Sequence, residues 1–310
     1  MKVWALHLGL IAVLFAAQFL LPPYHVTNLA RIMVLAVFAI GYNLAFGYTG
    51  LLSLGHALFF AAGMYGAGLA AQLLGWTAAP ALIIGVVAGG VVAAAVGLLA
   101  LRTAGVSFMI VTLMFAQAGY LAILYFAPVT GGDEGFVIDS ASRAFAGLDV
   151  TIDGIRYALA LLLFTLALVV SLWLVRSPFG RTMVAMRENE ERARMLGYNP
   201  FVVKLVALVI SGLFAGAAGG AYAVLFGYVG ASFATIQYSI LPLLYVLLGG
   251  AGTVIGPFLG AALMFYMVDV ASGLTSAYLF VVGAALVVLV LFAPKGILGT
   301  IRDRWVRWLP

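Results

Sequence analysis

Apolar runs long enough to cross a bilayer recur along almost the whole of this 310-residue chain. An α-helix needs about 20 apolar residues to cross the hydrocarbon core. Charged residues make up only 8% of the chain, whereas soluble domains contain roughly 25%. Strands of a membrane β-barrel would instead alternate between apolar and polar residues. We therefore predict an all-α polytopic membrane bundle that uses residues 1–310 as one transmembrane domain.

Ten of these runs are predicted to span the membrane, with eight as the alternative, because glycines interrupt the third, eighth and ninth runs. The first run is expected to stay on the protein as a span. It is too long for a signal peptide and ends in Leu-Pro-Pro without a small-residue cleavage pattern. The predicted spans are residues 3–21, 29–46, 54–74, 80–101, 104–127, 157–175, 205–227, 233–249, 254–271 and 276–293.

The distribution of basic residues predicts the orientation of the chain. Cytoplasmic segments of membrane proteins carry an excess of Lys and Arg. With an even number of spans and the N-terminus in the cytoplasm, only Arg31, Arg143 and Arg156 fall on the outer side. Both termini are therefore predicted to be cytoplasmic. The basic residues assigned to the cytoplasmic side are Lys2, Arg102, Arg176, Arg181, Arg187, Arg192, Arg194, Lys204, Lys295, Arg302, Arg304 and Arg307.

Several classes of site are not indicated. The net charge of +5 does not predict a nucleic-acid partner, because the basic residues lie beside spans, next to membrane lipid. The chain has no cysteine, and His56 has no nearby His or carboxylate partner, so no metal site is predicted. It has no G-x-x-x-x-G-K-[ST] sequence to hold nucleotide phosphates. No catalytic constellation is recognisable, so we predict a non-enzymatic chain that itself carries no cofactor.

Residues 176–204 interrupt the apolar pattern with nine charged residues. Pro178 and Gly180 are predicted to end the sixth span, and residues 182–196 to form one short helix capped by Gly197. A solvated helix that only joins two spans is the alternative to a docking site. The predicted i,i+4 ion pairs are Arg187–Glu191, Glu188–Arg192 and Glu190–Arg194. The predicted weakly apolar stripe is Thr182, Met186, Asn189, Ala193 and Leu196.

The same segment resembles a motif of a known transporter family. Residues 191–197 have the spacing of E-A-A-x-x-x-G, the loop of ABC importer permeases, although Arg192 replaces an alanine and the downstream I-x-L-P is missing. Residues 177–199 read S-P-F-G-R-x-x-x-A-x-R-E-N-E-x-R-A-x-x-L-G-Y-N, which resembles the LivM branch of branched-chain amino-acid ABC permeases. Residues 41–65, 130–135 (T-G-G-D-E-G), 248–263 and 292–299 (F-A-P-K-G-I-L-G) resemble the same branch.

The resemblance implies an inner-membrane permease subunit that imports branched-chain amino acids, with urea, amides or aromatic acids as alternative cargo. In that family the charged loop is a cytoplasmic helix seated in a cleft of an ATPase subunit. The implied partners are a homologous second permease (LivH-like), two ATPases (LivG- and LivF-like) that hold ATP and magnesium, and an external solute-binding protein. The expected coupling residues are Arg187, Glu188, Asn189, Glu190, Glu191, Arg192, Ala193 and Gly197.

A glycine-rich polar cluster at membrane depth is expected to line the pathway. Glycines there permit a broken helix, and such breaks are tolerated where they face a cavity. The alternative is packing, in which the glycines let helices approach and the polar groups bond to neighbours. The same choice applies to the lone amide of Gln117 in the fifth span. The expected lining residues are Gly47, Tyr48, Ser53, Gly55, His56 and Gln117.

Three further features complete the predictions. In the external loop, residues 128–156, Asp133 and Glu134 are expected to meet the binding protein, with a solvated turn as the alternative. Glycines every four residues, at Gly212, Gly216 and Gly220, predict a close helix–helix contact. The glycines at residues 249–256 predict a tight turn between spans.

An ion-coupled carrier or channel acting alone is the rival interpretation, and a membrane scaffold is a third. Ion-driven carriers usually keep an ionisable group deep in the membrane. The predicted spans offer only His56 in such a position, since Asp269 lies near a span end. A charged loop without an internal coupling group favours energy supplied by another subunit.

Overall fold

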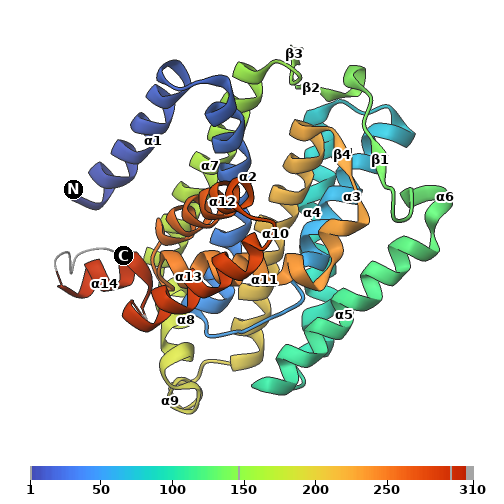
Figure 1. Ribbon diagram of the computed structural model, residues 1–310. Helices are drawn as coiled ribbons and strands as arrows, with labels where there is room; N and C mark the ends of the chain where they lie inside the picture. Colours follow the sequence, from blue (N-terminus) through green and yellow to red (C-terminus); the bar gives the residue numbers. More distant parts are fainter. Residues whose placement is uncertain (1, 146, 294, 305–310) are drawn as a thin grey trace.

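The computed structural model describes residues 2–145, 147–293 and 295–304. Most of these residues lie in helices that pack into one bundle, with a few short strands at one end (Figure 1). The predicted all-α membrane class is therefore confirmed. Arg307, assigned above to the cytoplasmic side, lies outside the described residues.

Eight helices carry most of the bundle. They are α1 (Lys2–Leu20), α2 (Pro23–Asn43), α3 (His56–Leu74), α4 (Ala78–Ala100), α5 (Val106–Tyr125), α7 (Asp153–Arg176), α10 (Pro200–Phe226) and α12 (Gly256–Leu274). Shorter helices are α6 (Ala127–Thr130), α8 (Pro178–Glu188), α9 (Glu190–Met195), α11 (Ile236–Gly249), α13 (Tyr278–Phe292) and α14 (Gly296–Arg304). Helical turns are the π-helical η1 (Leu44–Tyr48) and the 3-10 turns η2 (Ser140–Arg143) and η3 (Ala231–Ala234). The strands are β1 (Phe136–Val137), β2 (Ala144–Phe145), β3 (Leu148–Asp149) and β4 (Tyr228–Val229).

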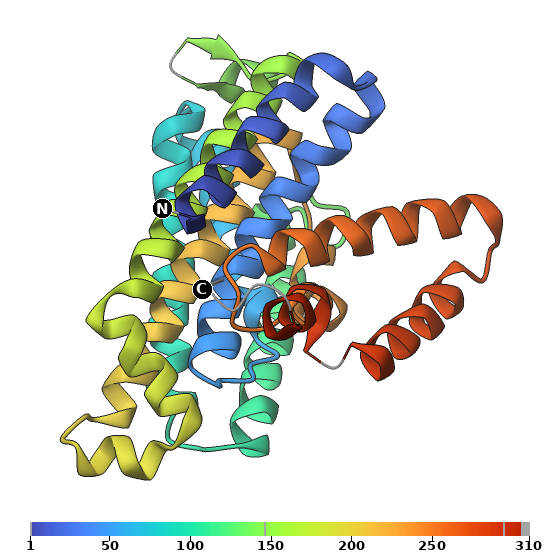
Figure 2. The ribbon, with the colours of Figure 1, turned by 90° about the vertical axis from the view of Figure 1, so that its left-hand side faces the viewer.

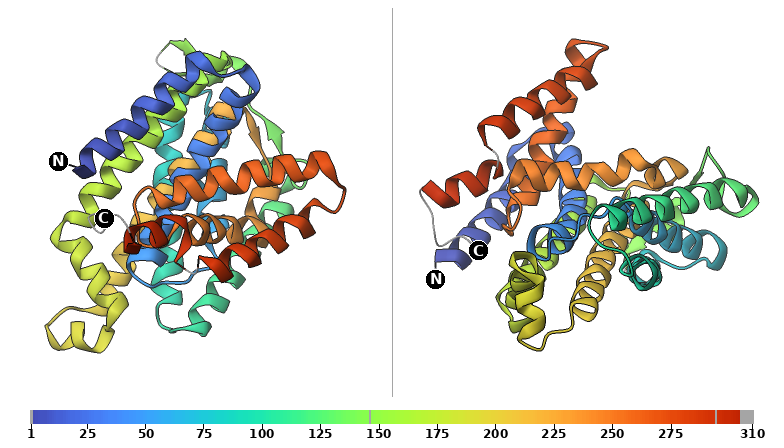
Figure 3. Two further views of the ribbon diagram at one scale, coloured as in Figure 1. Left: turned by 60° about the vertical axis from the view of Figure 1, so that its left-hand side comes forward. Right: turned by 90° about the horizontal axis from the view of Figure 1, so that it is seen from below.

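Each of the ten predicted spans coincides with an apolar helix. Eight helices in the described part of the chain are long and apolar enough to cross a membrane. The eighth and tenth predicted spans correspond to α11 and α13, which have only 14 and 15 residues. Length and composition therefore support eight spans, the alternative count. Figures 2 and 3 show α12 and α13 as a hairpin that projects away from the long helices.

The helix α2 forms the centre of the bundle. Every residue from 32 to 45 is buried, including Tyr42 and Asn43. The helices α7, α10 and α12 pack against α2, whereas α1 lies outside and contacts chiefly α7. The Tyr157 hydroxyl of α7 donates to the Leu14 carbonyl of α1 at 2.6 Å. An outer helix, a middle layer and a buried centre therefore share one apolar composition, so the order of the layers is set by packing.

The predicted glycine contact is confirmed between α10 and α4. A Cβ on Gly216 would lie only 2.6 Å from the Gly85 carbonyl oxygen, and one on Gly89 would lie 2.6 Å from the Gly212 oxygen. The backbones of the two helices therefore touch directly, as small residues permit in membrane bundles. Gly63 brings α3 against the same stretch of α10. The three helices α3, α4 and α10 form one closely packed unit.

The two ends of the bundle have different structures. At one end, β1 pairs antiparallel with β4, which joins residues 136–137 to residues 228–229. The charged segment, residues 176–204, lies at the opposite end (Figure 2). The loops that follow α5 and α10 therefore share one face, and the charged segment lies on the other.

Candidate functional site

The charged segment begins where the sequence predicts the sixth span to end. Helix α7 stops at Arg176, and Ser177 is extended, with a ψ of 166°. The Ser177 hydroxyl oxygen accepts a hydrogen bond from the Gly180 amide at 3.2 Å, and Pro178 occupies the first turn of α8. A serine N-cap followed by proline is a standard helix start. The chain therefore leaves the membrane helix and begins a new helix within two residues.

The prediction of one helix over residues 182–196 is wrong, because the helix breaks at Asn189. This residue is extended (φ −159°, ψ 101°), and its side-chain oxygen accepts from the Arg192 amide at 2.9 Å as the N-cap of α9. The break separates the partners of two predicted ion pairs, Arg187–Glu191 and Glu188–Arg192. Of the three predicted pairs, only Glu190–Arg194, which lies wholly within α9, forms among the described residues, at 3.9 Å.

A small apolar cluster holds α8 and α9 against the start of α10. Met186, Ala193 and Val203 are buried together, with Phe179 packed on them. The predicted apolar stripe is therefore correct at Thr182, Met186 and Ala193, which are buried. It is wrong at Asn189, which is exposed at the break, and at Leu196, which is 72% exposed because the second helix ends before it. The predicted cap is confirmed: Gly197 has a φ of +89°, which favours glycine.

An ion pair and the N-cap of α10 complete the segment. The Lys204 ammonium donates to a Glu190 carboxylate oxygen at 2.5 Å and so joins α9 to α10. Asn199 caps α10, since its side-chain oxygen accepts from the Phe201 amide at 3.0 Å. The remaining expected coupling residues Glu188, Glu191 and Arg192 are exposed. The charged segment therefore exposes charged side chains on one face, while its other face packs against α10.

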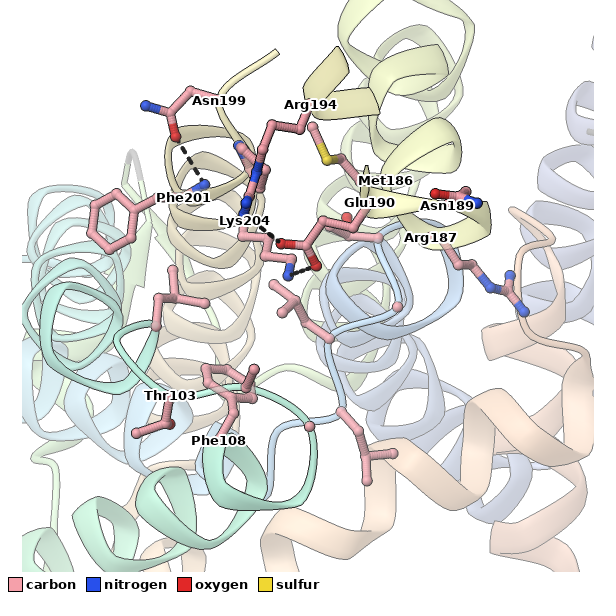
Figure 4. A pocket seen from close by; sticks show the side chains of 18 of the residues that line it. Thr103, Phe108, Met186, Arg187, Asn189, Glu190, Arg194, Asn199, Phe201 and Lys204 are labelled. Carbon is pink, nitrogen blue, oxygen red and sulfur yellow. Dashed lines mark hydrogen bonds and ion pairs between the residues drawn. The ribbon is translucent and has the colours of Figure 1, made fainter. Parts of the chain in front are cut away.

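A hollow of about 1050 Å³ lies beside the charged segment. It is lined by the loop after η1, the turn between α4 and α5, and the inner edge of the charged segment. Figure 4 shows Glu190 and Lys204 at its edge, with Thr103 and Phe108 on the opposite side. The side chain of Arg187 points away from the Glu190–Lys204 pair (Figure 4). The hollow thus separates the charged segment from α5.

The predicted break near Gly47 is present. Helix α2 widens into η1, and residues 49–55 then run without helical structure to α3. Hydrogen bonds within the break satisfy its backbone groups, for example from the Thr49 hydroxyl to the Leu44 carbonyl at 2.9 Å. The Leu54 amide donates to the Thr112 hydroxyl oxygen of α5 at 3.1 Å. The break is therefore an ordered feature that contacts α5.

The expected lining residues are placed as follows. Gly47, Tyr48, Ser53, Gly55 and His56 are all buried within this chain, and Gln117 is half-buried on α5. The hollow is lined by the neighbouring residues 49–52 and by none of these six. Their role in lining a pathway stays a prediction.

His56 sits among aromatic rings at the start of α3. Its Nε2 lies 2.8 Å from the Ser211 hydroxyl of α10, and its ring is 4.6 Å from the Tyr42 ring in an edge contact. The Tyr42 hydroxyl donates in turn to the Ser53 carbonyl at 3.0 Å. These contacts join α2, α3 and α10 around the break.

A group that the sequence did not single out is Asn43, the last residue of α2. Its amide nitrogen donates to the Thr253 carbonyl at 2.9 Å, and its side-chain oxygen accepts from the Gly252 amide at 2.9 Å. The Arg187 guanidinium donates to the Gly47 carbonyl one turn further on. No local sequence pattern predicts contacts between residues so far apart. The glycine run at residues 249–256 is the signal that could have indicated such a contact, because glycines allow a buried amide to reach the backbone.

On the opposite face, Asp133 and Glu134 are exposed beside glycines with positive φ, as the predicted turn requires. Arg143 donates to the Val224 and Leu225 carbonyls at 2.8 and 2.7 Å, so it caps the C-terminus of α10. Burial lowers the pKa of this guanidinium. The loop of residues 128–156 is thereby fixed to α10.

The fold and the site define a multi-pass membrane protein with an ordered, charged segment at one end. A family model described as "Branched-chain amino acid transport system / permease component" matches residues 25–292, and the chain belongs to that family. The members of this family are permease components of transport systems.

Named relatives agree with this assignment. The high-affinity branched-chain amino acid transport system permease protein LivM of Salmonella typhimurium is 30% identical, over 96% of this chain and 75% of that protein. LivM of Escherichia coli K12 is 31% identical, over 88% and 69%. The autoinducer 2 import system permease protein LsrC of Photorhabdus laumondii is 31% identical, over 50% of this chain and 47% of that protein. No solved structure matches the chain significantly.

Proposed function

We propose that this chain is a permease subunit of an ATP-driven, binding-protein-dependent importer in the bacterial cytoplasmic membrane, and that its cargo is leucine, isoleucine and valine. Family membership and the names of the two LivM relatives support the cargo. The LsrC relatives cover only half of the chain, so they support permease architecture more than a second cargo.

The observation that carries the proposal is the construction of the charged segment. Two short helices meet at a capped break and pack on α10 through Met186, Ala193 and Val203. Their outer face leaves Glu188, Glu191 and Arg192 exposed. A loop that only joined two spans would not need a core of its own. A charged segment that is packed in this way can enter a cleft on a cytoplasmic ATPase.

The proposed assembly has one further permease (LivH-like), two ATPases (LivG- and LivF-like) and an external solute-binding protein. ATP and magnesium bind on the ATPases. This chain's residues would seat one ATPase through the charged segment and meet the binding protein near Asp133 and Glu134. Movement of the seated ATPase would shift the charged segment and change the side to which the pathway opens.

The test is uptake of labelled leucine into proteoliposomes that hold the full set of subunits, with each component omitted in turn. Gly197→Asp is the matching variant: it puts a charged side chain at φ +89° where α9 ends. Gly75→Asp is its control, because Gly75 ends α3 with the same left-handed geometry (φ +65°) and has open space around it.

We expect uptake to need ATP, both ATPases and the binding protein, and Gly197→Asp to lose most uptake while Gly75→Asp keeps it. Normal uptake by Gly197→Asp would show that the charged segment does not couple. Uptake by this chain alone along an ion gradient would establish the rival carrier. ATP hydrolysis by the full set without leucine uptake would retain the architecture and change the cargo.

A further inference from the structure

Polar contacts connect the charged segment to the interior of the bundle. It begins at Arg187 of α8, which donates to the carbonyl of Gly47, 140 positions away in the sequence. Asn43, which precedes Gly47 by one helical turn at the end of α2, forms hydrogen bonds with the loop between α11 and α12. The charged segment and the α11–α12 turn are therefore both hydrogen-bonded to residues 43–47, at the end of α2.

Asn43 is the centre of these contacts. It is 2% exposed, and its side chain uses both ends: the nitrogen donates to Thr253 and the oxygen accepts from Gly252, each at 2.9 Å. A buried amide that loses such partners leaves backbone groups unsatisfied. The two segments are in close contact here, because a Cβ on Gly47 would lie 2.6 Å from the Gly252 nitrogen. The break in α2 and the α11–α12 turn meet backbone to backbone.

The local backbone departs from regular α-helix. Residues 44–48 form a π-helical turn, a feature that frequently occurs at functional sites. Gly50 and Gly252 have φ of +79° and +73°, which only glycine adopts readily. A Cβ on Gly50 would lie 3.2 Å from the Arg187 side chain, so α8 rests directly on this stretch.

We propose that Arg187, Gly47 and Asn43 form a relay that passes a displacement of the charged segment to the α11–α12 turn, with Asn43 as the positioning residue at its centre. The inference rests on the proposed function, in which the charged segment seats an ATPase. A displacement of α8 pulls on the Gly47 carbonyl, and Asn43 carries that pull to Gly252 and Thr253. Helices α11 and α12 then move with the ATPase.

The test measures leucine taken up per ATP hydrolysed in proteoliposomes of the full complex. Asn43→Leu keeps the number and branching of the side-chain heavy atoms and removes both hydrogen bonds. Asn28→Leu is its matched control, since Asn28 lies on the same helix, is 6% exposed, and its amide nitrogen has no hydrogen-bond partner in the part of the chain that the structure describes. We expect a loss of at least tenfold in the ratio for Asn43→Leu and no change for Asn28→Leu.

A second variant, Arg187→Met, keeps the proposal testable if Asn43→Leu does not assemble, because Arg187 is exposed whereas Asn43 is buried. The two variants combined give the decisive readout. In a relay, the double variant loses no more than the worse single one, whereas independent structural roles multiply. Multiplying losses, or an unchanged ratio in either single variant, would overturn the relay. Failure of the wild-type complex to need its ATPases would instead overturn the proposed function.

Discussion

Gly216 on α10 offers the sharpest test of how the bundle is held together. A Cβ at this position would lie 2.6 Å from the Gly85 carbonyl oxygen and 2.9 Å from the Gly89 Cα on α4. Carbon contacts settle at about 3.5–4.0 Å, so Gly216→Ala must separate the two helices by roughly 1 Å. Overpacking costs about 1–3 kcal/mol. Both obstacles are main-chain atoms that cannot rotate away, so we expect a loss of about 3 kcal/mol.

The assay is reversible unfolding in mixed micelles at increasing SDS fraction, followed by tryptophan fluorescence. Gly220→Ala is a graded comparison: its nearest obstacle is the flexible Leu82 side chain at 3.3 Å, so the cost should stay below about 1 kcal/mol. Gly9→Ala is the control, because nothing lies within 4 Å and replacing a helical glycine gains up to about 1 kcal/mol. Equal unfolding free energies for Gly216→Ala and Gly9→Ala would refute backbone contact between α4 and α10.

Other predictions concern the two ends of the bundle. Arg143→Met should leave two carbonyls at the end of α10 without their donors, at a cost of about 1–3 kcal/mol, and faster proteolysis of the loop at residues 128–156 would reveal it. Asn199→Ala should cost about 1 kcal/mol through loss of the α10 cap, and hydrogen exchange at Phe201 measures it. Lys204→Met should free α9 by up to about 1 kcal/mol through loss of the Glu190 pair, and unchanged exchange across residues 190–195 would contradict this.

The positions of the helices were predictable because membrane crossing depends directly on apolar length. Their order in space was not, because every span is apolar and no charge pattern separates an outer helix from a central one. The helix α1 is mostly exposed while α2 is almost wholly buried, yet both are apolar helices, of 19 and 21 residues. The stacked glycines of α10 were the exception, since a spacing of four puts them on one face where only close packing explains them.

The candidate site was predictable in its location and partly in its detail. The charge density marks residues 176–204, and Gly197 marks the end of the helix. The break at Asn189 could have been predicted, because asparagine followed by two glutamates is typical of an N-cap and the first turn of a helix. The i,i+4 ion-pair pattern instead favoured one continuous helix. Asn43 could not be predicted, because its partners lie 209 and 210 residues away and no local periodicity reports such contacts.

Two groups of glycines in this chain bear on how a displaced charged segment could act. Those of α3, α4 and α10 bring backbones into contact, and a unit packed at that density compresses little. Those at Gly50, Gly250 and Gly252 have positive φ and lie where helices stop. A displacement that begins at α8 cannot be absorbed inside the packed unit. It must appear at the ends of α2 and α11, where Arg187 and Asn43 already hold the backbone.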